Sequence, residues 1–345
     1  MEDNRNNLYR GCLIGGAIGD ALGWPVEFMR LVEIKNKYGT EGIKTLDSSP
    51  DGPAEITDDT QMTIFTIEGL LRAENRGNNK GIVDVPMMVY KSYLRWLSTQ
   101  GIETDAEKDG WVYTIDVLHN RRAPGNTCLS ALHSGTIGQV SKPINNSKGC
   151  GGVMRTAPVG LLYSKKRAFQ LGCELGAITH GHPSGFLPAG GLSYLIASIL
   201  ETRDLPLSVE LMVEELENCP NHEECSTLLK KALKLAYSNS DDEEAIRTLG
   251  EGWVGEEALA ISIFCSLKYQ GDFQKAVISS VNHNGDSDST GAITGNILGA
   301  LLGLEGIPIQ WINNVELKDE IIQLADDVLT RYEESESWHR KYPGW

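Results

Sequence analysis

The chain has 345 residues, 41% of them hydrophobic and 23% charged, and a formal net charge of −16. This composition is typical of a soluble globular protein, and the excess of acidic residues argues against nucleic acid or an anionic membrane surface as a partner. The polar start MEDNRNNLYR does not suit a secretory signal, and no stretch approaches the length of a membrane span. Seven cysteines without paired spacing favour reduced thiols, so we expect a cytoplasmic protein.

The predicted elements are helices along the whole chain. Apolar residues recur at helical spacing, with polar residues between them, in eight segments: 60–76, 86–98, 166–179, 190–203, 208–219, 225–238, 256–270 and 319–335. Alternating strand patterns are nearly absent, which predicts an all-α fold. The turn-rich pieces between the segments are too short for linkers, so we expect a single domain over residues 1–345.

Two further segments carry a glycine at every fourth position. These glycine ridges are Gly11, Gly15, Gly19 and Gly23 near the start, and Gly291, Gly295, Gly299 and Gly303 near the end. Residues four apart share one face of a helix, and glycine on that face lets another backbone approach closely. We predict that both segments are buried helices and that the two ridges pack together, which brings the N-terminal segment beside the motif GDSDSTG.

Acidic residues gather at the start of two apolar helical patterns. ITDDTQM holds Thr57, Asp58 and Asp59, and GDSDST holds Asp286 and Asp288. Helix capping explains one acid of the first motif, in which Asp58 and the glutamine three residues later resemble a capping box. It does not explain four carboxylates with several hydroxyls beside them.

Four acids brought together repel one another unless cations neutralise them. Ligands that are all oxygen favour hard ions, Mg²⁺ or Mn²⁺, over zinc, and a pair of such ions can orient a substrate oxygen and activate a water. A calcium loop of the EF-hand kind is the alternative, because Asp286, Asp288, Thr290 and Gly291 occupy its first, third, fifth and sixth places. Ile297 stands at the twelfth place, where that loop has Glu.

Further candidates lie between the two acidic motifs. In NNSKGCGGVMRTAPVG, a serine and three glycines precede a short apolar helix, namely Ser147, Gly149, Gly151 and Gly152. Their backbone N–H groups suit a phosphate, and a plain tight turn is the alternative. Arg155 fits a phosphate contact or a structural ion pair equally well. His180 and His182 of ITHGHP are expected to fix a loop or line a pocket.

Six motifs taken in order resemble the ADP-ribosylglycohydrolase family, which includes the dinitrogenase-reductase-activating glycohydrolases. They are GCLIGGAIGDALGWPVEF, ITDDTQM, GNTCLSAL, NNSKGCGGVMRTAPVG, ITHGHP and NGDSDSTGAITGNILGA, and they span Gly11 to about Gly303. The resemblance implies a compact all-α domain with two Mg²⁺ or Mn²⁺ ions in a cleft. It also implies removal of ADP-ribose from a modified side chain.

The resemblance assigns roles to individual residues. The metal-binding positions of the family match Thr57, Asp58, Asp59, Asp286, Asp288 and Ser289. The loop expected to approach ADP-ribose matches Gly149, Gly151 and Gly152, with Ser147 before them. Glu27 matches an acid that lies over the metal centre in some members. We therefore expect Glu27, Asp58, Asp59 and Asp288 to be catalytic, and the loss of Asp59 or Asp288 to be the most damaging.

The motif forms GCGGVMR, THGHP and DSDST are closer to branches that act on ADP-ribosyl-arginine than to those that act on serine or on O-acetyl-ADP-ribose. We therefore predict hydrolysis of N-linked ADP-ribosyl-arginine on a modified protein, reversing mono-ADP-ribosylation. An immunity protein is an alternative, which neutralises an ADP-ribosyltransferase toxin by hydrolysis or by blocking its active site. A structural protein is another, since lens crystallins arose from this family. Because no matched acid is missing, hydrolysis is favoured over both.

Overall fold

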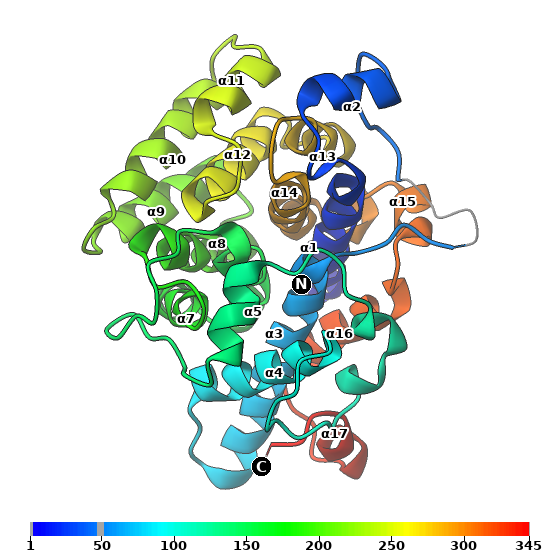
Figure 1. The fold of residues 1–345 in the computed structure, drawn as a ribbon, viewed down its shortest axis with the longest axis vertical. Helices are drawn as coiled ribbons and strands as arrows, with labels where there is room; N and C mark the ends of the chain where they lie inside the picture. Colours follow the sequence, from blue (N-terminus) through cyan, green and yellow to red (C-terminus); the bar gives the residue numbers. More distant parts are fainter. Residues whose placement is uncertain (1–2, 47–51, 345) are drawn as a thin grey trace.

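The computed structural model of the chain describes residues 3–46 and 52–344, and it is built from helices (Figure 1). The α-helices are α1 (Asp3–Gly23), α2 (Leu31–Tyr38), α3 (Asp58–Lys80), α4 (Val85–Thr99), α5 (Asn126–His133), α6 (Ala157–Leu162), α7 (Lys165–Ala177), α8 (Pro183–Thr202), α9 (Leu205–Glu217), α10 (Glu223–Ala236), α11 (Asp242–Leu249), α12 (Gly255–Lys268), α13 (Phe273–Val281), α14 (Ser287–Leu302), α15 (Ile309–Asn314), α16 (Lys318–Thr330) and α17 (Glu336–Lys341). Short 3₁₀ helices are η1 (Trp24–Val26), η2 (Val112–Thr114), η3 (Asp116–His119), η4 (Cys150–Gly152) and η5 (Leu304–Gly306). In the described ranges, β structure is limited to isolated bridges, so the predicted all-α class is confirmed.

Helices α1 and α14 pack backbone to backbone near the centre of the molecule (Figure 1). The two glycine ridges face each other in opposite directions, with Gly11 against Gly299, Gly15 against Gly295 and Gly19 against Gly291. A Cβ atom at any of these glycines would overlap the backbone of the opposite helix. The predicted pairing of the ridges is therefore confirmed. It places the loop after α1 against the first turn of α14, because the last glycine of the first ridge, Gly23, lies against the backbone of Ser287.

Helix α8 corrects one expectation drawn from the sequence. Its 20 residues are long and apolar enough to cross a membrane, so the statement that no stretch approaches that length is wrong for Pro183–Thr202. In the structure 89% of the apolar window is buried against neighbouring helices, including α6, α7, α9 and α12. A core helix with protein on every side is apolar all round, and it passes the same test of length and composition.

A buried ionic network joins α3 to α4. Glu68 of α3 is 0% exposed, and its carboxylate accepts hydrogen bonds from Arg72 Nε at 3.0 Å and Arg95 Nε at 3.0 Å, and also from the Ser92 hydroxyl. Arg72 also pairs with Asp109 at 2.8 Å. Every charge in this network therefore meets an opposite charge supplied by the protein.

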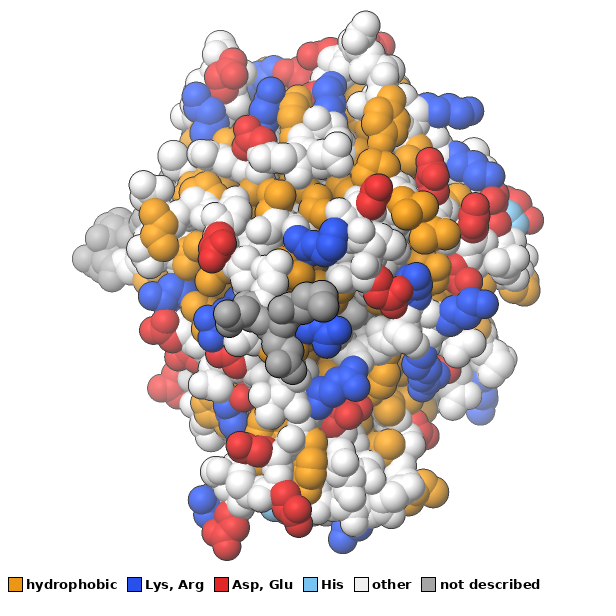
Figure 2. All heavy atoms as spheres, turned by 180° about the vertical axis from the view of Figure 1, so that it is seen from behind, with side chains coloured by type: hydrophobic (Ala, Val, Ile, Leu, Met, Phe, Trp, Pro, Cys, Tyr) orange, Lys and Arg blue, Asp and Glu red, His pale blue; other side chains and the backbone are white. Residues whose placement is uncertain are grey.

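The surface carries mixed charge on the face seen in Figure 2. Among the described residues on that face, acidic and basic side chains are interspersed with apolar ones and do not gather into one basic area. This pattern suits the acidic balance of the sequence. All seven cysteines carry free thiols, five of them buried.

Candidate functional site

The N-terminus of α3 is held by a carboxylate from α1. Asp20 is fully buried and accepts hydrogen bonds from the backbone N–H of Thr57 at 3.0 Å and of Thr60 at 3.1 Å, and from their hydroxyls at 2.8 and 2.5 Å. Burial and the nearby charge of Asp288 raise the pKa of Asp20 to about 7, although these hydrogen bonds lower it. Sequence reasoning did not single out Asp20. Its one signal is an acid within a helix of small apolar residues.

Thr57 is the N-cap of α3, as the capping prediction allowed. Its hydroxyl accepts a hydrogen bond from the Asp59 N–H at 3.3 Å. The capping box between Asp58 and Gln61 does not form, because Asp58 is already the first helical residue. The Gln61 side chain instead accepts a hydrogen bond from Trp96 of α4 at 3.1 Å. Tertiary contacts therefore override the local pattern at this helix start.

The second acidic motif begins α14. Asp286 is the N-cap and accepts a hydrogen bond from the Ser289 N–H at 3.3 Å, while Asp288 Oδ1 accepts from the same N–H at 2.9 Å. The EF-hand alternative is wrong, because the motif enters a helix at Ser287 instead of forming a loop. The Thr290 hydroxyl donates within the fold, for example to the Ser280 carbonyl at 2.7 Å.

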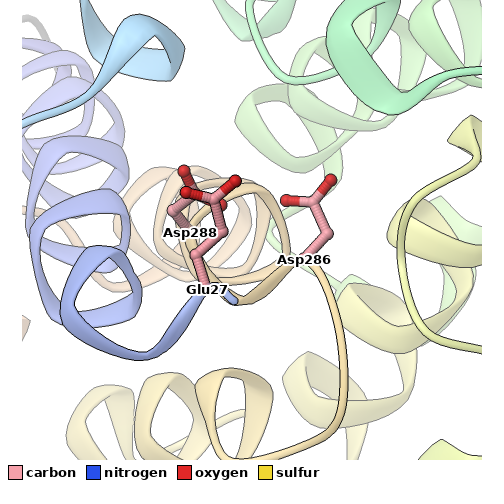
Figure 3. Close-up of side chains that lie close together, drawn as sticks. All are labelled: Glu27, Asp286 and Asp288. Carbon is pink, nitrogen blue, oxygen red and sulfur yellow. The ribbon is translucent and has the colours of Figure 1, made fainter. Parts of the chain in front are cut away.

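The two motifs meet in one cluster of carboxylates. One oxygen each from Glu27, Asp286 and Asp288 lies within 4.8 Å of the other two, and all three side chains are buried. Figure 3 shows the three carboxylates extending to the same side of the α14 N-terminus, with Glu27 coming from the loop after α1. Asp58 and Asp59 line the same cavity. The structure thus brings together all five acids that the sequence singled out.

The hydroxyls of the two motifs lie at the edges of this cluster. The Thr57 hydroxyl is 3.3 Å from Asp288 Oδ2, so it bridges the N-termini of α3 and α14. Ser289 lines the cavity beside Cys150, whose thiol donates to Asp286 Oδ2 at 2.7 Å. Among these five acids, two carboxylate oxygens are buried and have no hydrogen-bond partner in the described part of the chain, Glu27 Oε2 and Asp59 Oδ1.

The electrostatics of the cluster are unfavourable for the protein alone. Burial is the largest cause that raises the pKa of Asp58, Asp59 and Asp288 well above the ordinary value, and repulsion among the acids adds to it. The same causes raise the pKa of Glu27 to about 11, with Asp288 as the main repelling charge. Buried carboxylates in this state need protons or cations. All-oxygen ligands with orphaned atoms fit hard divalent cations.

The glycine-rich loop forms one wall of a cavity of about 180 Å³. Gly149 and Gly151 line this cavity, whereas Gly152 is buried against the Gly185 carbonyl. Ser147 lies behind the wall, where its hydroxyl accepts the Gly149 N–H at 3.3 Å. The Cys150 N–H is also engaged, at 3.2 Å from the Trp253 carbonyl. The loop is therefore a fixed wall whose outer glycines face the acids.

Arg155 takes neither of the roles expected for it. Its side chain is fully buried, its guanidinium lies 4.3 Å from the centre of the Tyr93 ring, and it does not line the cavity. It forms no ion pair with any residue between 3–46 and 52–344. His182 caps α8 by accepting the Ser184 N–H at 3.0 Å, and His180 lines the cavity, so the two predicted histidine roles are confirmed.

An aromatic pair borders the cavity and was missed by sequence reasoning. Trp253, in the turn before α12, lines the cavity and is 39% exposed. Phe28, next to Glu27, is 71% exposed, and its ring stacks on that of Trp253 with centroids 5.9 Å apart and planes at 22°. Two exposed rings from segments 225 positions apart have no shared pattern in the sequence, so the pair becomes visible only in the fold.

Comparisons with known proteins point to one family. Residues 1–337 match the family model described as ADP-ribosylglycohydrolase. The chain is 25% identical to ADP-ribosyl-[dinitrogen reductase] glycohydrolase of Rhodospirillum rubrum (90% of this chain, 90% of the relative), 23% to ADP-ribosylhydrolase ARH3 of Bos taurus (95%, 93%) and 24% to ADP-ribosylarginine hydrolase Tri1 of Serratia proteamaculans (92%, 78%). A solved ADP-ribosylglycohydrolase-related protein complex shares the fold, with a TM-score of 0.67 at 23% identity, over 95% of this chain and 99% of that one.

Proposed function

Because the chain belongs to the ADP-ribosylglycohydrolase family, we propose that it is a metal-dependent hydrolase that removes ADP-ribose from modified protein side chains, with arginine as the modified residue. The observation that carries the proposal is the cluster of buried carboxylates with orphaned oxygens, which shares one cavity with the glycine-rich loop. A buried cluster of this kind costs stability unless it binds a ligand, so a structural role does not explain it.

The proposed cofactors are two divalent cations, Mg²⁺ or Mn²⁺. The residues that would hold them are Thr57, Asp58, Asp59, Asp286, Asp288 and Ser289. The chemistry that such ions supply when bound is Lewis-acid polarisation of oxygens, which orients ribose hydroxyls and makes a water more acidic. Burial and mutual repulsion raise the pKa values of Asp58, Asp59 and Asp288, so their ionised forms are unfavourable in the protein alone. Bound cations would relieve this, because a nearby positive charge favours the ionised form of a carboxyl. The raised pKa values therefore support the proposed cation binding.

The acids would also handle the proton of the reaction. Water adds to the anomeric carbon of the ribose, the bond from this carbon to the guanidine nitrogen breaks, and the nitrogen leaves with a proton. Glu27 is the proposed proton carrier, because its Oε2 is free within the cavity wall and its pKa lies high. Asp58, Asp59 and Asp288 are proposed to fix the reacting ribose through the cations. Gly149, Gly151 and Gly152, with Ser147 behind them, are the proposed wall for ADP-ribose.

Arginine is the proposed linkage for two reasons beyond the motif forms. ADP-ribosylarginine hydrolase Tri1 covers most of the chain at 24% identity. The stacked rings of Phe28 and Trp253 also offer a flat aromatic surface beside an acidic cavity. A guanidinium is planar and cationic, and it stacks well on aromatic faces, whereas a serine linkage has neither property.

The experiment is release of ADP-ribose from an arginine-modified protein and from a serine-modified peptide, each with EDTA, Mg²⁺ or Mn²⁺. We expect release from the arginine substrate only when a metal is present. Asp59→Asn is the inactive control, and Glu336→Gln, on an exposed surface pair, is the matched control that should keep full activity.

The outcomes separate the parts of the proposal. Release from the serine substrate alone would overturn the arginine linkage and leave the hydrolase standing. Metal-independent release would overturn the proposed role of the cluster. Lack of release from both substrates, with metal bound, would overturn the proposed reaction.

A further inference from the structure

A chain of hydrogen bonds runs from a buried cation to the cavity wall. Arg155 Nη2 donates to the Thr179 hydroxyl at 2.6 Å, and this hydroxyl lies 2.8 Å from His180 Nδ1. All three side chains are buried, and Arg155 and Thr179 are fully buried. The helix α7 ends just before Thr179, so the three groups are held by elements that belong to the core.

The number of hydrogens on the Thr179 oxygen decides what His180 carries. A hydroxyl has one hydrogen and two lone pairs, and Arg155, which only donates, occupies one of the lone pairs. The hydroxyl hydrogen is then free to point at His180 Nδ1. The competing acceptor is the sulfur of Cys128, and a thiol sulfur accepts only weakly. The Thr179 hydroxyl therefore donates to Nδ1, which must be unprotonated.

The remaining proton of the imidazole must then be on Nε2. A doubly protonated ring is disfavoured, because burial and the positive charge of Arg155 lower the pKa of His180 to about 3. The opposite tautomer, with hydrogen on Nδ1, would leave the buried Thr179 hydroxyl hydrogen without a good acceptor, at a cost typical of unsatisfied buried groups. The neutral ring with Nε2–H gives the Thr179 hydroxyl hydrogen an acceptor at Nδ1 and leaves the Nε2–H free to donate to a ligand.

The free N–H faces the cavity. His180 lines the cavity, and a Cβ built on Gly149 would lie 3.1 Å from Nε2, while one on Gly151 would lie 3.0 Å from the neighbouring Cε1. Within residues 3–46 and 52–344, Nε2 has no hydrogen-bond partner. The Nε2 edge of the ring therefore faces the cavity beside Gly149 and Gly151, the two loop glycines that border the acids.

We propose that Arg155 and Thr179 are positioning residues that hold His180 as the Nε2–H tautomer, so that this N–H donates to an oxygen of the ADP-ribosyl group in the cavity. The identity of the ligand rests on the proposed function, but the tautomer does not. The arrangement explains why a buried arginine lies here without a counter-ion. Its charge keeps the ring neutral, and its N–H orients the threonine.

The first test needs no substrate. In the ¹⁵N-labelled protein, long-range ¹H–¹⁵N correlation spectra distinguish a protonated from an unprotonated ring nitrogen, and His180→Gln identifies the signal among the seven histidines. We expect His180 as Nε2–H near neutral pH in the wild type. In Thr179→Val, which keeps the shape and removes the hydroxyl, we expect both tautomers; Thr179→Ser should restore the single one. A wild-type Nδ1–H or doubly protonated ring would overturn the proposal.

The second test measures binding of free ADP-ribose by calorimetry. Thr179→Val should bind about tenfold more weakly, as the loss of one oriented donor implies, with Thr179→Ser near the wild type. In a His180→Ala background, Thr179→Val should have no further effect, because it acts through the ring. Thr294→Val is the matched control, since that hydroxyl is buried and donates to a helix carbonyl at 2.7 Å.

The outcomes keep this inference separate from the proposed reaction. Equal losses of affinity in Thr179→Val and Thr294→Val, or undiminished loss in the His180→Ala background, would overturn the positioning role. If the wild type carries Nε2–H and binds ADP-ribose but hydrolyses neither the arginine nor the serine substrate, the proposed reaction fails and the positioning role stands.

Discussion

Helix α3 carries buried carboxylates at two places, and the protein treats them in opposite ways. In the middle of the helix, Glu68 meets two arginines and a serine hydroxyl. At its N-terminus, Asp58 accepts one N–H from Gly125 at 3.1 Å, and Asp59 keeps an orphaned oxygen. Burying a carboxylate is costly at both places, so the difference lies in the source of the positive charge. Arg72 and Arg95 supply it at Glu68, and no basic side chain of the described residues supplies it at Asp58 and Asp59. The first site is complete without a ligand, whereas the second needs protons or the proposed cations.

The comparison predicts its largest effect on turnover, for changes in the acidic cavity at the N-termini of α3 and α14. Asp59→Asn and Asp288→Asn should each lower the rate of ADP-ribose release about 1,000-fold or more, because the acids act as a unit. Neither change should reduce the melting temperature of the metal-free protein, since each removes a buried carboxylate that no basic side chain of the described residues neutralises. Turnover assays and thermal unfolding in EDTA check the two halves. A variant that keeps full turnover with metal present would contradict the proposed site.

The mid-helix site should behave in the reverse manner. Glu68→Gln leaves two buried arginines short of charge, so we expect the free energy of unfolding to fall by about 3–5 kcal/mol. Turnover per folded molecule should remain unchanged. Glu336→Gln is the control, because its pair with Arg340 is exposed and should matter by less than about 1 kcal/mol. Urea unfolding measures both, and equal effects of the two variants would end the distinction between the sites.

The pH dependence of stability should also separate the two regions. A carboxyl whose folded pKa is raised stabilises the fold below its ordinary pKa, and this contribution is lost as the pH rises through the folded value. The pKa of Asp20 at about 7 lies inside the range from pH 5 to pH 8, and that of Glu27 at about 11 lies above it. The metal-free protein should therefore lose stability steadily as the pH rises over this range.

Adding the cation should counter this loss. At about 100 times its Kd, Mg²⁺ bound only to the folded state stabilises by about 2.7 kcal/mol. Melting curves at several pH values in EDTA and in Mg²⁺ test this, with Glu68→Gln retaining the metal response and Asp288→Asn losing it. A melting temperature that rises with pH in EDTA would show that the acids are not the source of the instability.

The glycine ridges tie the acidic site to the core, and they suggest a smaller effect. Gly295→Ala forces a methyl group against the backbone at Gly15, so we expect a loss of about 1–3 kcal/mol or more. Gly77→Ala, on α3, is the matched control, because its Cβ would lie 3.6 Å from the nearest side-chain atom. That change should stabilise by about 0.5–1 kcal/mol through helix propensity. Denaturant midpoints compare the pair, and a tolerated Gly295→Ala would weaken the close-packing interpretation.

Much of the fold and of the acidic site could be predicted from the sequence, because the relevant signals are local. Glycine every fourth residue specifies a face of a helix, and two such faces have few other surfaces on which to pack. The acids of the two motifs stand at helix starts, where turn chemistry is readable. Fold class and the gathering of Asp58, Asp59, Asp286 and Asp288 followed from these patterns.

The parts that were missed depend on contacts between distant segments. Asp20 matters because α1 brings it to residues 37 and 40 positions away. The predicted capping box is absent because the N-cap is Thr57 instead of Asp58, and the Gln61 side chain accepts a hydrogen bond from Trp96 on another helix. Arg155 fits a phosphate site by its position after glycines, yet the fold turns it onto Tyr93. No local pattern records which of several possible partners the fold will bring near.

The smallest expected effect concerns the aromatic pair of Phe28 and Trp253. It tests whether these rings contact the modified side chain or the base of the nucleotide. Phe28→Leu keeps apolar bulk but removes the ring that stacks on Trp253. If the pair receives the guanidinium, KM for the arginine-linked substrate should rise about two- to fivefold, as exposed cation–π contacts imply, with kcat nearly unchanged. Ile82→Ala is the control, because Ile82 is 73% exposed and lies outside the cavity lining.

The affinity for free ADP-ribose distinguishes between the two kinds of contact. An equal loss of that affinity would mean that the rings receive the base, because free ADP-ribose has no guanidinium, and unchanged affinity would place the target arginine on the rim.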